Sequence, residues 1–195
     1  MRGHWDPLPT ARRLLPRPDV FTGTWSERNW RNVPGPFYGA TTDSMMLGRT
    51  DAPRHICYDD DLGGGFGAEF VHRQPVTEAE TADLVSAASM EPYGGYGWDG
   101  DEHWTPETVR EWWRDRGRVR EWALATAADW SADTHPDWGD NAADRYRDHY
   151  LDAARGHRDF AAYIDDGGLE GYLRGYVFWL DHRRAPRRWE RLPKL

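Results

Sequence analysis

Apolar positions in the second half of the chain recur every three or four residues, which predicts helices. The clearest case is 106–130: Thr105 suits an N-cap, Pro106 suits the first helical position, and the helix dipole favours an acid at Glu107. Gly117 interrupts this segment and marks a kink or a short break. The apolar stripe is Val109, Trp112, Trp113, Val119, Trp122, Ala123, Ala127 and Trp130. Such a stripe is typical of a core helix, and the alternative is a tryptophan surface kept for a ligand or partner.

The same period predicts four further helices. Thr77 and Glu80 form a capping box at the start of a helix over 77–88, each satisfying a backbone N–H of the other. After a linker at 131–139, the remaining three helices are expected over 141–155, 157–164 and 169–181. All of these lie after residue 76.

Strand signals lie in the first half. A weak alternation predicts a strand over 37–42, and 54–59 with 68–73 reads as a β-hairpin joined by the glycine-rich connection DDDLGGGFG. Strands followed by helices predict an α+β fold, with a small antiparallel sheet from the N-terminal half packed against a mainly helical C-terminal half. The expected organisation is an Arg/Pro-rich arm over 1–20, a single globular α+β domain over 21–182 and a basic tail over 183–195.

Composition narrows the class of protein. Hydrophobic residues make up only 38%, but 12 tryptophans bury much apolar area, so a globular chain is expected rather than a disordered one. The apolar runs are too short to span a membrane and the first residues do not resemble a secretory signal, which predicts a cytoplasmic protein. Lys194 is the only lysine, and this usage is typical of a GC-rich bacterial genome. A single cysteine, Cys57, excludes an intrachain disulfide and a cysteine-ligated zinc or iron–sulfur cluster.

Charge weighs against nucleic acid as a partner. The net charge is -8, which disfavours binding driven by phosphate neutralisation. The basic residues nevertheless gather at the two ends: six lie in 183–194 against the single acid Glu190. These ends either dock on the protein's own acidic surface or contact phosphate or RNA.

The loop 91–104, which leads into the helix over 106–130, is the favoured place for a site. Its segment GWDGDEHW carries Asp99, Asp101, Glu102 and His103, but it departs from the EF-hand pattern, so neither a metal nor a cofactor is predicted. Weak candidates for catalysis are Glu102, His103, Asp99 and Asp43, and the expected ligand-binding side chains are Tyr38, Tyr96, Trp98 and Trp104. The alternative is a helix-entry loop whose aromatics pack on the core. If a pocket exists, it should lie where 91–104 meets 37–44.

Two further clusters have a structural and a chemical interpretation. Cys57 becomes an activated nucleophile if the hairpin register places His72 beside it, and otherwise it is a buried neutral thiol. The run Asp59-Asp60-Asp61 is either a solvated hairpin tip or a negative patch for a basic partner. The pattern of a phosphate-binding loop is absent.

Three functions remain. The first is a small acidic binding protein that sequesters or neutralises a partner, of the immunity or self-resistance type; interface hot spots are rich in tryptophan, tyrosine and arginine. The second is a small-molecule enzyme that uses acid–base residues of 91–104. The third is a phosphate or RNA binder that uses the arginine-rich ends. The expected partner is a protein or a small molecule, nucleic acid and membrane being disfavoured.

Overall fold

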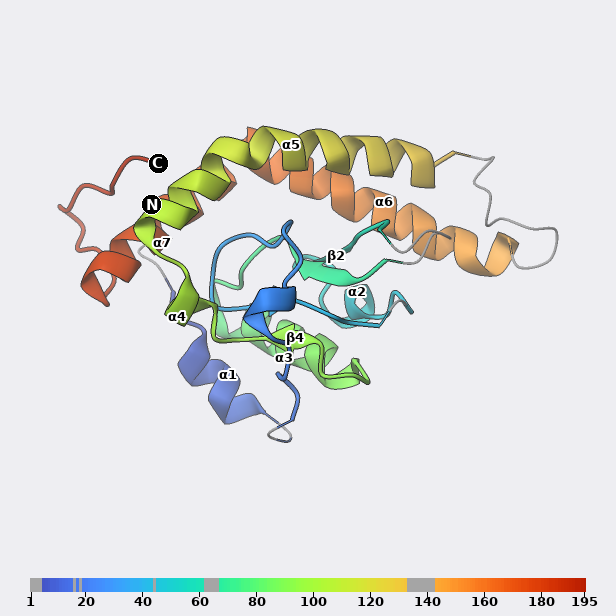
Figure 1. The fold of residues 1–195 in the computed structure, drawn as a ribbon, viewed down its shortest axis with the longest axis horizontal. Coiled ribbons are helices and arrows are strands. Elements are labelled where there is room, and N and C mark those ends of the chain that lie inside the picture. The colour runs from blue at the N-terminus through green and yellow to red at the C-terminus, as the bar shows by residue number, and fades with distance from the viewer. Residues whose placement is uncertain (1–4, 16, 18, 44, 62–66, 133–142) are drawn as a thin grey trace.

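The fold was analysed in a computed structural model (Figure 1), which describes residues 5–15, 17, 19–43, 45–61, 67–132 and 143–195. Helices contain 53% of the described residues and strands 7%. This balance, with the long helices in the C-terminal half, confirms the α+β prediction.

The strands form two short antiparallel pairs. Strand β1 (Tyr38–Gly39) pairs with β4 (Tyr96–Gly97), and β2 (Ile56–Tyr58) pairs with β3 (Glu69–Val71). The expected hairpin is therefore present, in shorter form. The side chain of Asn32 joins the two pairs, because its Oδ1 accepts from Gly39 N at 2.9 Å and from Val71 N at 2.8 Å. One buried amide thus substitutes for ladder hydrogen bonds between β1 and β3.

Three long helices cover the strands. They are α5 (Pro106–Trp130), α6 (Ala143–Asp165) and α7 (Gly168–His182). Figure 1 shows α5 and α6 running side by side above β2, and α6 packs against that strand. The N-cap of α5 is Thr105, as predicted, but the short break considered at Gly117 is absent, because the helix is continuous through that residue.

One predicted boundary in this layer is wrong. Helix α6 runs through the break expected between 155 and 157. Gly156 serves close packing there: a Cβ at this position would lie 2.2 Å from the Arg49 guanidinium. The glycine is needed because another segment approaches the helix closely.

Shorter helices complete the fold. They are α1 (Leu8–Leu14), the 3₁₀ turn η1 (Trp25–Glu27), α2 (Gly48–Asp51), α3 (Glu78–Met90) and α4 (Gly100–His103). The capping box of α3 is only half formed. Thr77 Oγ1 accepts from Glu80 N, but the Glu80 carboxylate accepts from Val76 N, one residue before the expected donor.

Both ends of the described chain pack on the fold. Helix α1, within the segment expected as an arm, lies against α3 and buries Thr10 and Ala11. At the other end, Arg174 donates to the carbonyl of Pro193 and Arg110 donates to that of Lys194. Among the described residues, no helix is long and apolar enough to cross a membrane.

A tryptophan groove as the candidate functional site

A groove of about 360 Å³ lies between the segment 28–32 and the first half of α5. One wall is the exposed edge of the segment RNWRN, and the other is a stripe of α5 and the residue that precedes it. The lining residues are Arg28, Asn29, Trp30, Asn32, Trp104, Thr108, Glu111, Trp112, Asp115 and Arg118. We call this the tryptophan groove. Thr108, Glu111, Trp112 and Asp115 share one face of α5 because of their helical spacing, and Trp104 lies in extended backbone just before the N-cap Thr105.

Arginines lie over the indole rings of this groove. The Arg118 guanidinium is 4.0 Å from the ring centre of Trp30, and that of Arg28 is 3.9 Å from the ring centre of Trp25. Arg28 is also 5.8 Å from the ring of Trp104. These cation–π contacts fix the arginines while leaving their N–H groups for other acceptors.

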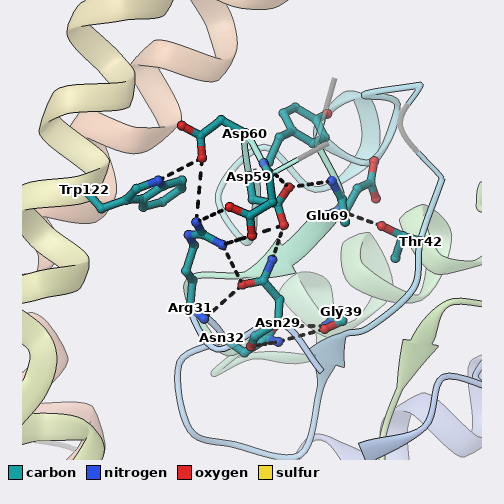
Figure 2. Close-up of polar contacts among 12 residues, drawn as sticks. Asn29, Arg31, Asn32, Gly39, Thr42, Asp59, Asp60, Glu69 and Trp122 are labelled. Carbon is teal, nitrogen blue, oxygen red and sulfur yellow. Dashed lines mark hydrogen bonds and ion pairs between the residues drawn. The ribbon is translucent and has the colours of Figure 1, made fainter. Parts of the chain in front are cut away.

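A buried arginine holds the wall of the groove from behind (Figure 2). Arg31 donates from both terminal nitrogens to Asp61, each at 2.8 Å. Its guanidinium lies between two indoles, 4.6 Å from the ring of Trp30 and 4.2 Å from that of Trp122. Trp122 in turn donates from Nε1 to Asp60 at 3.0 Å. The aspartate run after β2, the segment 28–32 and α5 are therefore tied together through one side chain.

The three aspartates of this run are not equivalent. The hydrogen bonds from Arg31 hold the pKa of Asp61 below its ordinary value. Asp59 is buried, and its Oδ2 lies 3.8 Å from Arg31, yet desolvation outweighs that attraction and raises its pKa. Asp59 also accepts from the Asn29 amide and from Ala68 N. A solvated tip is therefore the wrong description of Asp59, although Asp60 and Asp61 remain exposed.

The predicted meeting of 91–104 with 37–44 is present, because β1 pairs with β4. Tyr38 donates to Asp99 Oδ1 at 2.6 Å, and His103 Nε2 lies 3.1 Å from Asp99 Oδ2. Trp25 stacks on His103 with ring centres 4.7 Å apart and meets Trp104 edge-on at 5.2 Å. Tyr38, Asp99, His103 and Trp104 thus form one cluster that runs from the buried Tyr38 to Trp104 at the tryptophan groove.

Other residues predicted for the site lie apart from this cluster. Tyr96 is fully buried and donates to Glu69, Trp98 stacks on Phe21 at 5.3 Å, and the side chain of Glu102 is exposed. Only Trp104 and Asp43 of the predicted set line any of the four cavities considered for the described chain. The catalytic and ligand-binding roles given to the set stay predictions.

Asp43 belongs to a buried group of carboxylates with Glu69 and Glu91. The Glu91 carboxylate accepts from Asp43 N at 2.9 Å, and Glu69 accepts from Gly48 N at 2.8 Å. Burial raises the pKa of Glu69 to about 7. The space that these acids line has no room for a water molecule. A raised carboxyl pKa suits a general acid, but this one lacks space for a substrate.

The nucleophile hypothesis for Cys57 is wrong. The register places Cys57 opposite Phe70, while His72 N bonds to the carbonyl of His55. Burial raises the pKa of the Cys57 thiol to about 12, which keeps it protonated. This cysteine is a buried neutral side chain of the core.

The described residues contain no group of three or more His, Cys, Asp or Glu side chains arranged to hold a metal ion. No protein-family model matches the chain, and comparisons with curated proteins and with solved structures likewise find no match.

Sequence reasoning placed Trp104 in a site but missed Arg28, Trp30, Trp112 and Arg118. Trp112 was assigned to the core stripe, and it does pack partly against the core. The helical spacing of Trp112 with the charged Glu111, Asp115 and Arg118 was the available signal. The contribution of Trp30 depended on where a loop folds, and no local pattern reveals that.

Proposed function

We propose that the protein is a binding protein that captures a basic protein partner through the tryptophan groove. One observation carries this proposal: three tryptophans and two arginines line a single open groove. Tryptophan and arginine are the residue types most enriched at the energetic centres of protein interfaces. Their half-buried rings are already held in place, so binding would lose little side-chain entropy.

Charge favours a basic partner. Glu111 and Asp115 line the groove, Asp60 and Asp61 are exposed behind its wall, and the whole chain carries -8. Opposite charge steers association and disfavours acidic competitors. A partner whose working surface is covered in this way would be neutralised, as expected of an immunity or self-resistance protein. Cysteine and lysine usage suggest the cytoplasm of a bacterium as the setting.

The test is capture of partners with a charge-reversed groove. Glu111→Lys combined with Asp115→Lys reverses both carboxylates that line the groove, and each replaces a surface residue whose ion pair is worth little to stability. Glu107→Lys combined with Glu121→Lys makes the same charge change on exposed positions of α5 that do not line the groove. We expect the first double variant to weaken partner binding by roughly tenfold or more, and the second to change it much less.

Partners are first retained from a native lysate on the purified protein and then identified. Each partner is then titrated by itself, and its affinity for the wild type and for both double variants is measured. The proposal is supported if the wild type binds basic proteins, the groove variant loses this binding and the matched variant keeps it. Equal retention by both variants, or partners that are themselves acidic, would contradict it. Trp112→Ala is expected to weaken the same binding by about 2 kcal/mol, with circular dichroism as the check on folding.

A further inference from the structure

A second cleft, of about 340 Å³, lies at the open end of the β2–β3 hairpin, against α6. Arg54, His72 and Arg73 come from the hairpin side, where His72 N bonds to the carbonyl of His55 at 2.9 Å. The opposite wall is a stripe of α6 and the residue after it: Asp159, Ala162, Tyr163 and Asp166. Ala162, Tyr163 and Asp166 follow Asp159 by three, four and seven residues, which places all four on one face of the helix. The cleft therefore has a wall with two cations and a wall with two anions.

These charges do not neutralise one another. No ion pair within the described chain joins Arg54 or Arg73 to Asp159, Asp166 or any other carboxylate. Arg73 instead lies 4.0 Å from the ring centre of Tyr163, and its buried Nε has no hydrogen-bond partner. Asp166 uses one oxygen to accept from Gly168 N, which leaves the other oxygen open. Charged groups of both signs thus face one space without pairing across it.

A buried histidine lies at the floor of this cleft. His72 is 3% exposed, and its Nδ1 has no hydrogen-bond partner. Desolvation and the nearby arginines hold the pKa of His72 well below its ordinary value, so the ring is neutral. A neutral imidazole donates through one nitrogen and accepts through the other. The unpaired Nδ1 is itself covered by protein, so a ligand in the cleft would lie against the ring rather than bond to that nitrogen.

We propose that this cleft binds a small zwitterion that carries a carboxylate and an ammonium group, such as a free α-amino acid. The carboxylate accepts from Arg54 and Arg73, and the ammonium donates to Asp159 and Asp166. Arginine suits this role because its planar fork matches the two oxygens of a carboxylate. The volume lies near the lower end of the roughly 300–1,000 Å³ range of ligand pockets, which fits a ligand of this size.

This site is separate from the tryptophan groove. The two share no lining residue, and they lie against different long helices, α6 and α5. Failure of one proposal therefore leaves the other standing. If both hold, the protein responds to a metabolite as well as binding a partner.

The experiment titrates the full-length protein with each common L-α-amino acid and follows heat and the ring resonances of its histidines. The N-acetyl and methyl-ester forms of each amino acid remove one charge at a time. We expect at least one free amino acid to bind and to shift a histidine resonance. Both blocked forms should bind roughly tenfold more weakly or worse, because each loses a charged hydrogen bond.

Three variants locate the binding. Arg54→Gln and Asp159→Asn change exposed side chains and should each weaken binding by roughly tenfold, while Ala162→Trp fills the cleft from an exposed position and should abolish binding. Matched controls are Arg114→Gln, Glu121→Gln and Ala125→Trp, all exposed on α5 and away from the cleft. These controls should bind as the wild type does.

Each other outcome overturns the proposal. If none of the amino acids binds, the proposed site is rejected. Binding that the N-acetyl forms retain would show a plain carboxylate site and reject the zwitterion. Binding that survives Ala162→Trp, or that the α5 controls lose, would place the ligand elsewhere.

Discussion

Two clusters of acids differ in their partners: one contains an arginine and the other does not. Behind the tryptophan groove, Asp59 and Asp61 lie around Arg31, whose side chain is only 4% exposed. Between β3, α2 and α3, the carboxyl groups of Asp43, Glu69 and Glu91 accept from backbone N–H groups and, in the case of Glu69, from Tyr96. No described cation pairs with any of these three.

The comparison shows that burial raises the pKa of an acid in both clusters, with or without a nearby arginine. Desolvation raises the pKa of Asp59 beside Arg31 and raises that of Glu69 to about 7. The Arg31 hydrogen bonds lower the pKa only of Asp61, whose carboxylate is more than half exposed. The cluster around Arg31 also supports the wall of the tryptophan groove, so disrupting it should weaken partner binding as well as lower stability.

The largest effect is expected on removing the arginine. Arg31→Ala leaves Asp59 buried without its cation, and we expect the free energy of unfolding to fall by about 3–5 kcal/mol. Urea denaturation at neutral pH measures this loss. Arg118→Ala is the control, because it removes another arginine from Trp30 at an exposed position and should cost under about 1 kcal/mol. Similar losses for both variants would mean that Arg31 contributes only its contact with the ring.

Next in size is the pH dependence due to Glu69. Its pKa is raised from 4.5 to about 7 in the folded state, so folding favours the protonated form. Its stabilising contribution is complete below the unfolded pKa and is lost as pH rises through 7. The full change is about 3 kcal/mol at about 1.4 kcal/mol for each pKa unit. Urea denaturation from pH 4.5 to 8 measures it, and Glu69→Gln should remove this part of the slope. An unchanged slope in that variant would assign the effect to other groups.

The smallest effect is expected at the exposed member of the arginine cluster. Asp61 is 56% exposed, so Asp61→Asn should cost only about 1 kcal/mol at neutral pH despite its two hydrogen bonds to Arg31. Its pKa is lowered in the folded state, so its contribution is present above the unfolded value and is lost as pH falls through the folded value. The cost measured by thermal unfolding should therefore shrink in acid. A loss as large as that of Arg31→Ala would show that Asp61, rather than Asp59, carries the cluster.

Local signals predicted much of the fold. The cap at Thr105, the stripe of α5 and the hairpin of β2 and β3 follow from rules that act within a few residues. The helix break expected near Gly156 is absent. The glycine instead leaves room for the side chain of Arg49, a residue about a hundred positions earlier in the chain. The same limit applies to Asp59, whose burial depends on Arg31 and Asn29.

The candidate site was likewise predicted only in part. The sequence identified the loop 91–104 and its meeting with 37–44, and β1 and β4 bear out that contact. It did not reveal that the larger spaces lie elsewhere, beside Trp30 and beside His72.

The sequence by itself determined where the long helices lie, though not that α6 is continuous, together with the hairpin and the acidic, tryptophan-rich character of the chain. It could do so because capping, periodicity and charge are local or additive properties. Only the tertiary structure decided which tryptophans line a groove, which acids meet an arginine, and which charges face each other across a cleft. The physical reason is that burial and charge pairing depend on distances between segments far apart in the chain. Those distances are set by the packing of the whole fold.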